Sequence, residues 1–263
     1  MSDVLRVERT GSVARVTLAR PEVRNAFNAE LIAAVREAFE RLSVESSETL
    51  RAVVLTGDGK AFCAGADIEW QRAARSLSME ENVADAGRLQ EMLAAIDECP
   101  VPVMAAVHGV ALGGGMALCC VADITLGTAD AIFGFTEVKL GLIPAVISPF
   151  VLARIGEGAA RALFLSGEPF GSERALRIGL VSEVLPDEPS LHARVEAIVA
   201  EVLSAGPEAA RNAKSMIREQ RGLSRGDSLE RTVQWAARQR VSPEGQEGLG
   251  AFLEKRKATW RDD

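Results

Sequence analysis

The sequence predicts an α/β fold, in which strands and helices alternate and a helical tail follows. Short apolar runs typical of strands are separated by segments with helical periodicity up to about residue 185. From Pro189 onward the pattern is helical throughout, and the composition changes between residues 190 and 206. We therefore expect a core over residues 1–200 and a helical region over residues 201–263.

The first quarter of the chain predicts two strands and one helix. Residues 14–18 alternate apolar with polar side chains, which is typical of a strand buried on one face, and Pro21 closes it. Asn28 can cap a helix whose apolar side chains recur every three or four residues. Residues 52–56 form an apolar run bounded by glycine, which favours a strand buried on both faces. The helix is expected to cover the sheet that these strands begin.

The remaining segments are expected to continue the alternation. Residues 69–98 are polar and compatible with helix, and their irregular apolar spacing indicates a lid-like or mobile region. The further strands that we expect cover residues 101–107, 123–126, 131–135 and 180–184. The further helices cover residues 150–155, 159–165, 191–203, 207–221 and 228–240, with a short one capped by Ser172 and a last one that begins at Ser242 and Pro243.

The composition argues against several classes of function. The chain has 263 residues and a net charge of −7, with an isoelectric point near 5.2, whereas nucleic-acid binding normally needs a basic face. Its four cysteines lack the paired spacing of a zinc site and it has two histidines, so we expect no metal. Cys63, Cys119 and Cys120 have apolar neighbours and are expected to be buried. Because we see neither a leader segment nor an apolar run of membrane length, we expect a cytoplasmic protein without membrane contact.

A run of glycines stands out within residues 108–120. Gly113, Gly114 and Gly115 lie where the strand expected at residues 101–107 gives way to an apolar helix. Consecutive glycines let the backbone approach a ligand closely, and the first N–H groups of a helix have no partner within it. These donors and the positive end of the helix dipole would stabilise a negatively charged oxygen. The alternative is a tight turn, and the spacing fits neither a dinucleotide fingerprint nor a P-loop.

Two further features could complete such a site. Ala64, Gly65 and Ala66 are small and leave their backbone exposed for contact, although a surface turn is the simpler interpretation. Glu137 follows the strand expected at residues 131–135, where it would serve either as an acid or base or as a solvated carboxylate. On its own, the glycine run would still need a second donor and a base to make a catalytic site.

Three motifs occur in a fixed order along the chain. They are Ala64-Gly65-Ala66-Asp67-Ile68, Gly113-Gly114-Gly115 and Phe133-Gly134-Phe135-Thr136-Glu137. In this order they resemble the enoyl-CoA hydratase/isomerase (crotonase) family, and the likeness extends from Arg20 to Lys257. The resemblance implies a crotonase-like spiral of ββα units with a C-terminal helical trimerisation region. Members of that family assemble as homotrimers, usually paired into homohexamers.

The resemblance also implies roles for individual residues. The N–H groups of Ala66 and Gly114 would form the oxyanion hole for the thioester oxygen of an acyl-CoA substrate. The coenzyme A portion is part of that substrate, so no separate cofactor is expected. The residues implied around coenzyme A are Arg24, Ala26, Ala64, Asp67 and Ile68, together with Phe252 and Lys255, which would approach from the tail, often across a subunit contact.

One departure from the hydratases of this family concerns their two glutamates. The second corresponds to Glu137, whereas Ala117 stands at the position of the first, so the mechanism with two glutamates cannot simply be transferred. Residues 140–150 resemble the bacterial methylglutaconyl-CoA hydratases of leucine and isoprenoid breakdown, in which a small residue also replaces the first glutamate. We expect a hydratase that acts on 3-methylglutaconyl-CoA through Glu137.

Two other functions remain open from the sequence. A Δ3,Δ2-enoyl-CoA isomerase also keeps one glutamate at the position of Glu137, because it moves a single proton between carbons. A non-catalytic scaffold that binds acyl-CoA or RNA is the other alternative, and the acidic composition disfavours RNA. His108 is expected to pack in a loop, and Trp260 to pack at an interface.

Overall fold

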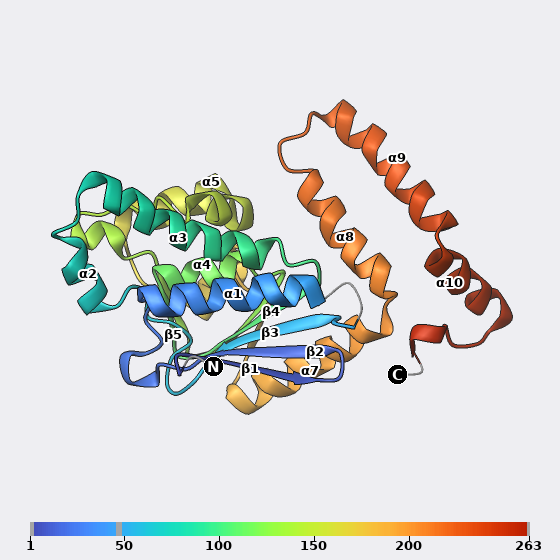
Figure 1. Cartoon of the computed structure of the whole chain (residues 1–263), viewed down its shortest axis with the longest axis horizontal. Helices are drawn as coiled ribbons and strands as arrows, with labels where there is room; N and C mark the ends of the chain where they lie inside the picture. Colours follow the sequence, from blue (N-terminus) through green and yellow to red (C-terminus); the bar gives the residue numbers. More distant parts are fainter. Residues whose placement is uncertain (1–2, 46–48, 262–263) are drawn as a thin grey trace.

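A computed structural model of the chain describes residues 3–45 and 49–261. It confirms the predicted α/β fold, with a larger sheet of order β1-β2-β3-β4-β6-β9 (Figure 1). Its strands are β1 (Leu5–Thr10), β2 (Val13–Leu18), β3 (Ala52–Gly57), β4 (Val103–Val107), β6 (Ile124–Thr128) and β9 (Glu183–Leu185). The pair β1 and β2 is antiparallel, and the other neighbouring pairs are parallel.

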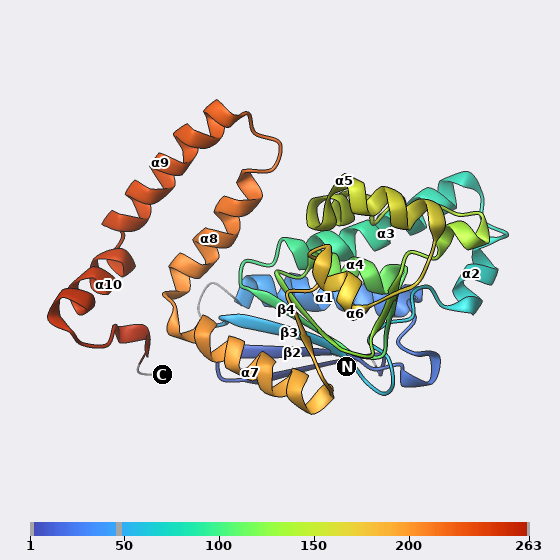
Figure 2. The same ribbon diagram turned by 180° about the vertical axis from the view of Figure 1, so that it is seen from behind.

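Helices cover both faces of this sheet (Figure 2). They are α1 (Ala29–Glu45), α2 (Ile68–Ala74), α3 (Met79–Asp97), α4 (Gly114–Val121), α5 (Ser148–Ser166), α6 (Ser172–Arg177), α7 (Glu188–Ser204), α8 (Pro207–Glu219), α9 (Arg225–Val241) and α10 (Pro243–Glu254). Short 3-10 turns are η1 (Pro21–Val23), η2 (Glu137–Leu140) and η3 (Thr259–Arg261). None of the helices in the described ranges combines the length and apolarity needed to cross a membrane.

Side-chain alternation explains why the sheet is covered twice. In β3, Val53 and Leu55 join the core cluster formed with α1, α3, α4 and α5, whereas Ala52 and Val54 join the cluster formed with α7. Successive side chains of a strand point to opposite faces, so an uninterrupted apolar run needs a layer on each side. The burial on both faces that was predicted for residues 52–56 is therefore confirmed.

Helix α1 begins where the sequence predicted. The side chain of Asn28 accepts a hydrogen bond of 2.8 Å from the N–H of Leu31, which satisfies one of the helix's first donors. Leu31, Val35 and Phe39 are fully buried on one side of the helix. Complete burial of such a side chain contributes about 1.5–3 kcal/mol, so this face fixes α1 against the sheet.

A second, smaller sheet lies beside the first. It consists of β5 (Val110–Leu112), β7 (Ile132–Gly134) and β8 (Phe170–Gly171), in the order β5-β7-β8. β5 and β7 run parallel. On its other side, β5 makes an isolated parallel bridge between Ala111 and Cys63. The smaller sheet thus brings the loop after β3 next to the glycine run.

Some elements differ from the sequence predictions. The strand expected at residues 180–184 begins only at Glu183, because Leu180 and Val181 are buried in the core without strand pairing. The expected cap at Ser172 is wrong, since its hydroxyl donates to the carbonyl oxygens of Thr128 and Ala131. The two helices expected within residues 150–165 are joined as α5 across a kink at Gly156, where φ is 72°.

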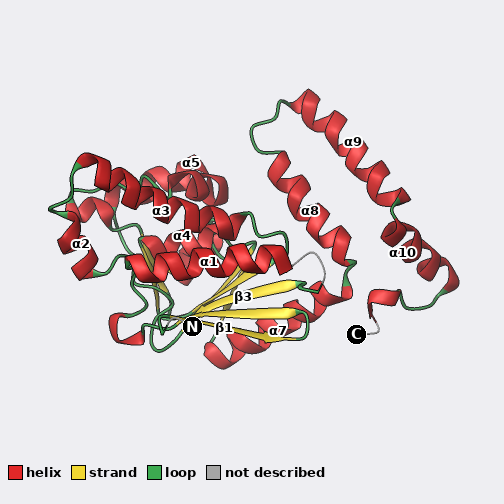
Figure 3. Ribbon diagram, in the orientation of Figure 1, coloured by secondary structure: helices red, strands yellow, loops and turns green. Residues whose placement is uncertain are grey.

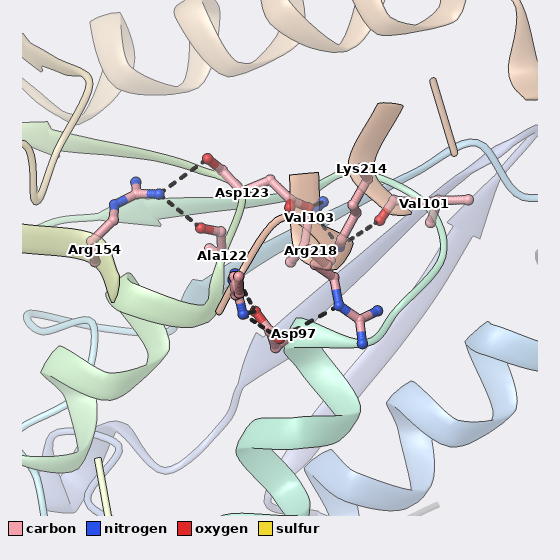
Figure 4. A network of polar contacts seen from close by, with 9 residues as sticks. Asp97, Val101, Val103, Ala122, Asp123, Arg154, Lys214 and Arg218 are labelled. Carbon is pink, nitrogen blue, oxygen red and sulfur yellow. Dashed lines mark hydrogen bonds and ion pairs between the residues drawn. The ribbon is translucent and has the colours of Figure 1, made fainter. Parts of the chain in front are cut away.

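The tail α8–α10 extends away from the core, at the opposite end of the molecule from α2 (Figures 1 and 3). A network of polar contacts fixes its base (Figure 4). The Lys214 ammonium donates to the Val101 carbonyl oxygen at 3.1 Å and lies 2.7 Å from Asp123 Oδ2. The same carboxylate oxygen accepts from the Val103 N–H at 2.7 Å. Only 8% of the Lys214 side chain is exposed, so this ion pair is largely shielded from water.

Candidate active site

The site lies where the loop after β3 meets the start of α4. Cys63 N–H donates to the carbonyl oxygen of Val110, and Leu112 N–H donates to that of Cys63, each at 3.0 Å. A second parallel bridge joins Phe27 to Ala66. Two loops that are far apart in the sequence are thereby held against the glycine run by backbone hydrogen bonds.

Each glycine of the run is required for a different reason. Gly113 has φ of +47°, a conformation that side chains disfavour. A Cβ on Gly114 would lie 2.6 Å from ring carbons of Phe27, and one on Gly115 would lie 2.3 Å from the carbonyl oxygen of Cys63. The glycines therefore permit close packing of the backbone against both neighbouring loops, as well as exposing donors.

Two backbone N–H groups face this junction without a partner. In the Phe27 bridge, the flanking groups are used, because Phe27 N–H donates to the Gly65 carbonyl oxygen and Asp67 N–H donates to that of Phe27. Within the described ranges, no hydrogen bond is donated by the N–H of Ala66 or of Gly114. Gly114 also begins α4, whose first N–H groups have no acceptor within the helix. Both residues line one cavity, where such donors would stabilise an oxygen that gains negative charge.

The cavity has a volume of about 310 Å³. Its polar side chains are those of Gln71, Asp85, Thr136 and Glu137. The other lining residues are apolar or glycine. They come from the two loops, the glycine run, α2, α3, the end of η2 and the segment after it: Phe27, Ala64, Gly65, Ala66, Trp70, Ala74, Leu89, Gly113, Gly114, Leu140, Leu142, Ile143, Pro144, Ala145, Val146 and Ile147. No basic residue is found among the described lining residues. The volume is at the lower end of the range usual for small-molecule sites.

Glu137 presents its carboxylate to the glycine run. A Cβ on Gly113 would lie 3.4 Å from Glu137 Oε1, so that oxygen is in contact distance of the loop. The other oxygen, Oε2, is buried and has no hydrogen-bond partner among the described residues. Burial raises the pKa of Glu137 above its ordinary value. A carboxylate in this state can accept a proton from a substrate or from water and return it.

Of the residues implied around coenzyme A, Ala64 lines the cavity, whereas Arg24, Ala26, Asp67 and Ile68 lie in the adjoining loops and at the start of α2. The Ala64 N–H donates to the Arg24 carbonyl oxygen at 2.9 Å, which brings their two loops together. Ala26 and Asp67 are buried, whereas Ile68 is exposed. Desolvation opposes ionisation of Asp67, but the Glu69 N–H and the Arg20 guanidinium outweigh it and hold the pKa of Asp67 below its ordinary value.

Phe252 and Lys255 are not brought to the cavity within one chain. Both lie at the end of the tail, which is at the opposite end of the molecule from α2 (Figures 1 and 2). The Phe252 side chain is 79% exposed. Trp260, by contrast, donates its indole N–H to the Ser204 carbonyl oxygen at 3.2 Å within the chain.

Three residues of the site were missed from the sequence. Phe27 packs over Gly114, Asp85 reaches the cavity from α3, and Arg20 joins the two loops. The only signal in the sequence was the family likeness that begins at Arg20. Asp85 gave no signal, because it belongs to a helix whose sequence is polar. Ala117 is fully buried in the core and does not line the cavity, so α4 contributes no second carboxylate.

No group of three or more metal-binding side chains is found in the described part of the chain. The four cysteines are buried, as predicted for three of them. His108 is also buried, and its Nε2 lies 3.0 Å from the Gly59 carbonyl oxygen, consistent with a packing role.

Comparisons with known proteins show which family and which structures the chain is similar to. Residues 8–263 match the family described as enoyl-CoA hydratase/isomerase. Enoyl-CoA hydratase AKT6-1 of Alternaria alternata is 32% identical over 95% of this chain and 81% of its own length. The crystal structure of an enoyl-CoA hydratase from Shewanella pealeana is 36% identical, with a TM-score of 0.92 over 98% of this chain and 96% of that one. Pseudomonas aeruginosa AtuE is 34% identical, with a TM-score of 0.93 over 98% of this chain and 99% of that one.

Proposed function

The chain belongs to the enoyl-CoA hydratase/isomerase family, and on that premise we propose that it adds water reversibly to the double bond of a 2-enoyl-CoA. The observation that carries the proposal is the meeting of two unpartnered N–H groups and one half-buried carboxylate in a single cavity. Ala66 and Gly114 supply the donors, and Glu137 supplies the carboxylate.

The first step uses the backbone donors. The thioester oxygen accepts hydrogen bonds from the N–H groups of Ala66 and Gly114. When a water oxygen forms a bond to the β-carbon, the electrons of the double bond move toward the thioester, whose oxygen gains negative charge. The two N–H groups stabilise that charge, and removing one such donor typically lowers the rate by about a hundredfold or more.

The second step uses Glu137 as the only proton carrier. Its carboxylate takes the proton that the attacking water loses, and the resulting acid returns a proton to the α-carbon as the enolate collapses. One hydroxyl group and one hydrogen are thus added, and the carboxylate is restored. The raised pKa of Glu137 suits both halves of this exchange, because general acid/base catalysis is most efficient near the working pH.

The acyl group that the sequence favours is 3-methylglutaconyl, whose distal carboxylate would need a partner. The described lining of the cavity offers Asp85 and no basic side chain. This observation weighs against a carboxylate-bearing acyl group within the cavity of one chain, while leaving the hydration chemistry unchanged.

We also propose that the enzyme acts as a homotrimer or homohexamer. The tail carries exposed apolar side chains, namely Leu229, Val233, Leu249, Phe252 and Leu253. Leu142 and Ile143 at the cavity, and Ile68 at the start of α2, are likewise exposed. Contact between the tail of one copy and the cavity of another would cover both sets and bring Phe252 and Lys255 to the coenzyme A portion. Light scattering at micromolar concentration tests this, and a monomer would contradict it.

The test of the function compares the wild type with Glu137→Gln. Hydration of crotonyl-CoA should fall by at least about a hundredfold in the variant, because glutamine keeps the shape but cannot accept a proton. Binding of the saturated analogue butyryl-CoA, measured by calorimetry, should persist. Glu157→Gln is the matched control, since its side chain is 75% exposed on α5 and does not line the cavity.

The isomerase alternative is favoured by the single glutamate, because moving a proton between two carbons needs only one base. A 3-enoyl-CoA substrate distinguishes the two reactions. If the wild type isomerises it rapidly but hydrates neither crotonyl-CoA nor 3-methylglutaconyl-CoA, the isomerase is the correct assignment. If the enzyme binds acyl-CoA and does neither reaction, the chain is a non-catalytic scaffold.

A further inference from the structure

Asp85 is an acidic side chain in the wall of an otherwise largely apolar cavity. It lies on α3, one helical turn before Leu89, and both residues line the cavity from the same side of that helix. Only 17% of the Asp85 side chain is exposed. The hydration steps proposed for the backbone donors and Glu137 do not involve Asp85, so its place in the wall needs a separate explanation.

The partner of Asp85 lies outside the cavity. Arg88 Nη1 is 3.1 Å from Asp85 Oδ1, and the Arg88 side chain is 59% exposed and does not line the cavity. Arg88 therefore balances the charge from the solvent side, where screening by water weakens its effect. A ligand in the cavity meets the carboxylate of Asp85 before the guanidinium of Arg88.

The location of Asp85 corresponds to the acyl portion of a substrate. In the proposed function, the Ala66 and Gly114 N–H groups hold the thioester oxygen, and coenzyme A lies on the side of the loops of Arg24 and Ala64, which a backbone hydrogen bond joins. The wall that remains for the acyl group comes from α2, α3 and residues 140–147. In that wall, the amide of Gln71 is the neutral polar group contributed by α2, and Asp85 is the charged group contributed by α3.

We propose that Asp85 determines acyl specificity by charge, so that the enzyme accepts uncharged acyl groups and excludes those that end in a carboxylate. This inference rests on the proposed function, because it assigns the cavity to the acyl portion of an acyl-CoA. Two like charges several ångström apart in a partly buried site lower affinity by roughly ten- to a hundredfold. An apolar wall already disfavours a carboxylate, and Asp85 adds repulsion that a substitution can remove.

The experiment measures binding, so it does not depend on turnover. Glutaryl-CoA carries a terminal carboxylate, and 5-methylhexanoyl-CoA has the same branched shape without the charge. Their dissociation constants are measured by calorimetry for the wild type, Asp85→Asn and Arg88→Gln. Glu80→Gln is the matched control, because it removes one negative charge from the exposed first turn of α3 outside the cavity.

The expected ratios differ between the variants. The wild type should bind the uncharged analogue at least about tenfold more tightly, and Asp85→Asn should reduce that preference by about fivefold or more. Arg88→Gln should increase the preference, because it removes the charge that partly offsets Asp85. Added salt should weaken the preference in the wild type, and Glu80→Gln should leave it within about twofold.

Failure of this inference is distinguishable from failure of the proposed function. The role of Asp85 would be overturned if the wild type and Asp85→Asn preferred 5-methylhexanoyl-CoA over glutaryl-CoA to the same degree. It would also be overturned if the wild type bound glutaryl-CoA more tightly, even if crotonyl-CoA is hydrated. Efficient hydration of 3-methylglutaconyl-CoA would also overturn it. Absence of hydration with every enoyl-CoA would reject the hydratase, whereas the binding ratios would still test the charge selection.

Discussion

The ring of Phe27 fills the space that a side chain on Gly114 would need. A Cβ added to Gly114 would lie 2.6 Å from both Cδ2 and Cε2 of that ring. Gly114→Ala should therefore displace the Gly114 N–H, reduce hydration by about a hundredfold and lower stability by about 1–3 kcal/mol. Steady-state kinetics and denaturant unfolding measure the two effects.

The steric origin of this effect can be checked with a second substitution. Phe27→Leu shortens the side chain over Gly114. The double variant Phe27→Leu/Gly114→Ala should therefore recover part of the hydration rate that Gly114→Ala loses. Gly87→Ala is the control, because a Cβ there meets nothing within 4 Å. Loss of activity in Gly87→Ala, or no recovery in the double variant, would argue against the contact with Phe27.

Arg20 holds the two loops of the site together. Its guanidinium donates to the Ala26 carbonyl oxygen at 2.6 Å and to Asp67 Oδ2 at 2.9 Å. Arg20→Met should reduce kcat and lower stability by about 3 kcal/mol near neutral pH, because Asp67 would stay buried without its cation. Arg20→Lys should keep only part of the kcat and part of the stability, since an ammonium lacks the forked geometry of a guanidinium.

The stability effect of Arg20→Met should depend on pH. The folded protein holds the pKa of Asp67 below 3.8, so this stabilisation is present above that pH and is lost as the pH falls through the lowered value. Melting temperatures of the wild type and variant should therefore converge in acid. A difference that stays constant down to strongly acidic pH would show that the Asp67 pairing is not its source.

Glu137 should impose the opposite pH dependence. Its pKa in the folded protein is raised above 4.5, so the folded state loses stability relative to the unfolded chain as the pH rises from 4.5 through the raised value. Glu137→Gln removes this cost and should melt at a higher temperature at neutral pH. The gain should disappear well below pH 4.5. A variant that is less stable at neutral pH would contradict the desolvated carboxylate.

Lys214 should control how firmly the tail is fixed to the core. Lys214→Met removes a cation that is 8% exposed and leaves Asp123 without it, so stability should fall by about 3 kcal/mol. Amide hydrogen exchange should accelerate in α8–α10 before it changes in the sheet. Arg231→Gln, which breaks an exposed pair with Glu219, should change stability by less than about 1 kcal/mol.

The cysteines should be unreactive in the native protein. Burial raises the pKa of Cys63 and of Cys120 to about 12, and raises the pKa of Cys119 well above its ordinary value. Because the thiolate is the reactive form, a disulfide reagent near pH 8 should label these thiols slowly and all four only after unfolding. Rapid labelling of the folded chain would show that the core opens more easily than its packing indicates.

Local patterns were sufficient to predict much of the fold. The apolar run at β3 and the cap at Asn28 depend on neighbouring residues, and both are confirmed. β5 was missed because three residues carry too little pattern to identify a strand. The start of β9 was predicted at residue 180 and lies at Glu183. Leu180 and Val181 are apolar because they pack in the core, and they do not pair with a strand. The mobility expected within residues 69–98 stays a prediction.

The site was predictable only where residue type itself shows the chemistry. The sequence itself shows consecutive glycines and a carboxylate after an expected strand, and Gly113, Gly114 and Glu137 line one cavity. The contribution of Asp85 could not, since an acidic residue on a polar helix is usually solvated. Its role depends on where α3 packs relative to residues 140–147, which is determined by tertiary contacts.

The bridge between Cys63 and Ala111 has a consequence for folding kinetics. It joins the segments that carry the Ala66 and Gly114 N–H groups, and these segments meet through contacts between distant parts of the chain. Such contacts require loop closure and generally form more slowly than helices. During refolding, turnover should therefore reappear later than the far-ultraviolet circular dichroism signal of the helices. Partially folded chains would therefore contain helices but would not turn over substrate until the two segments have met.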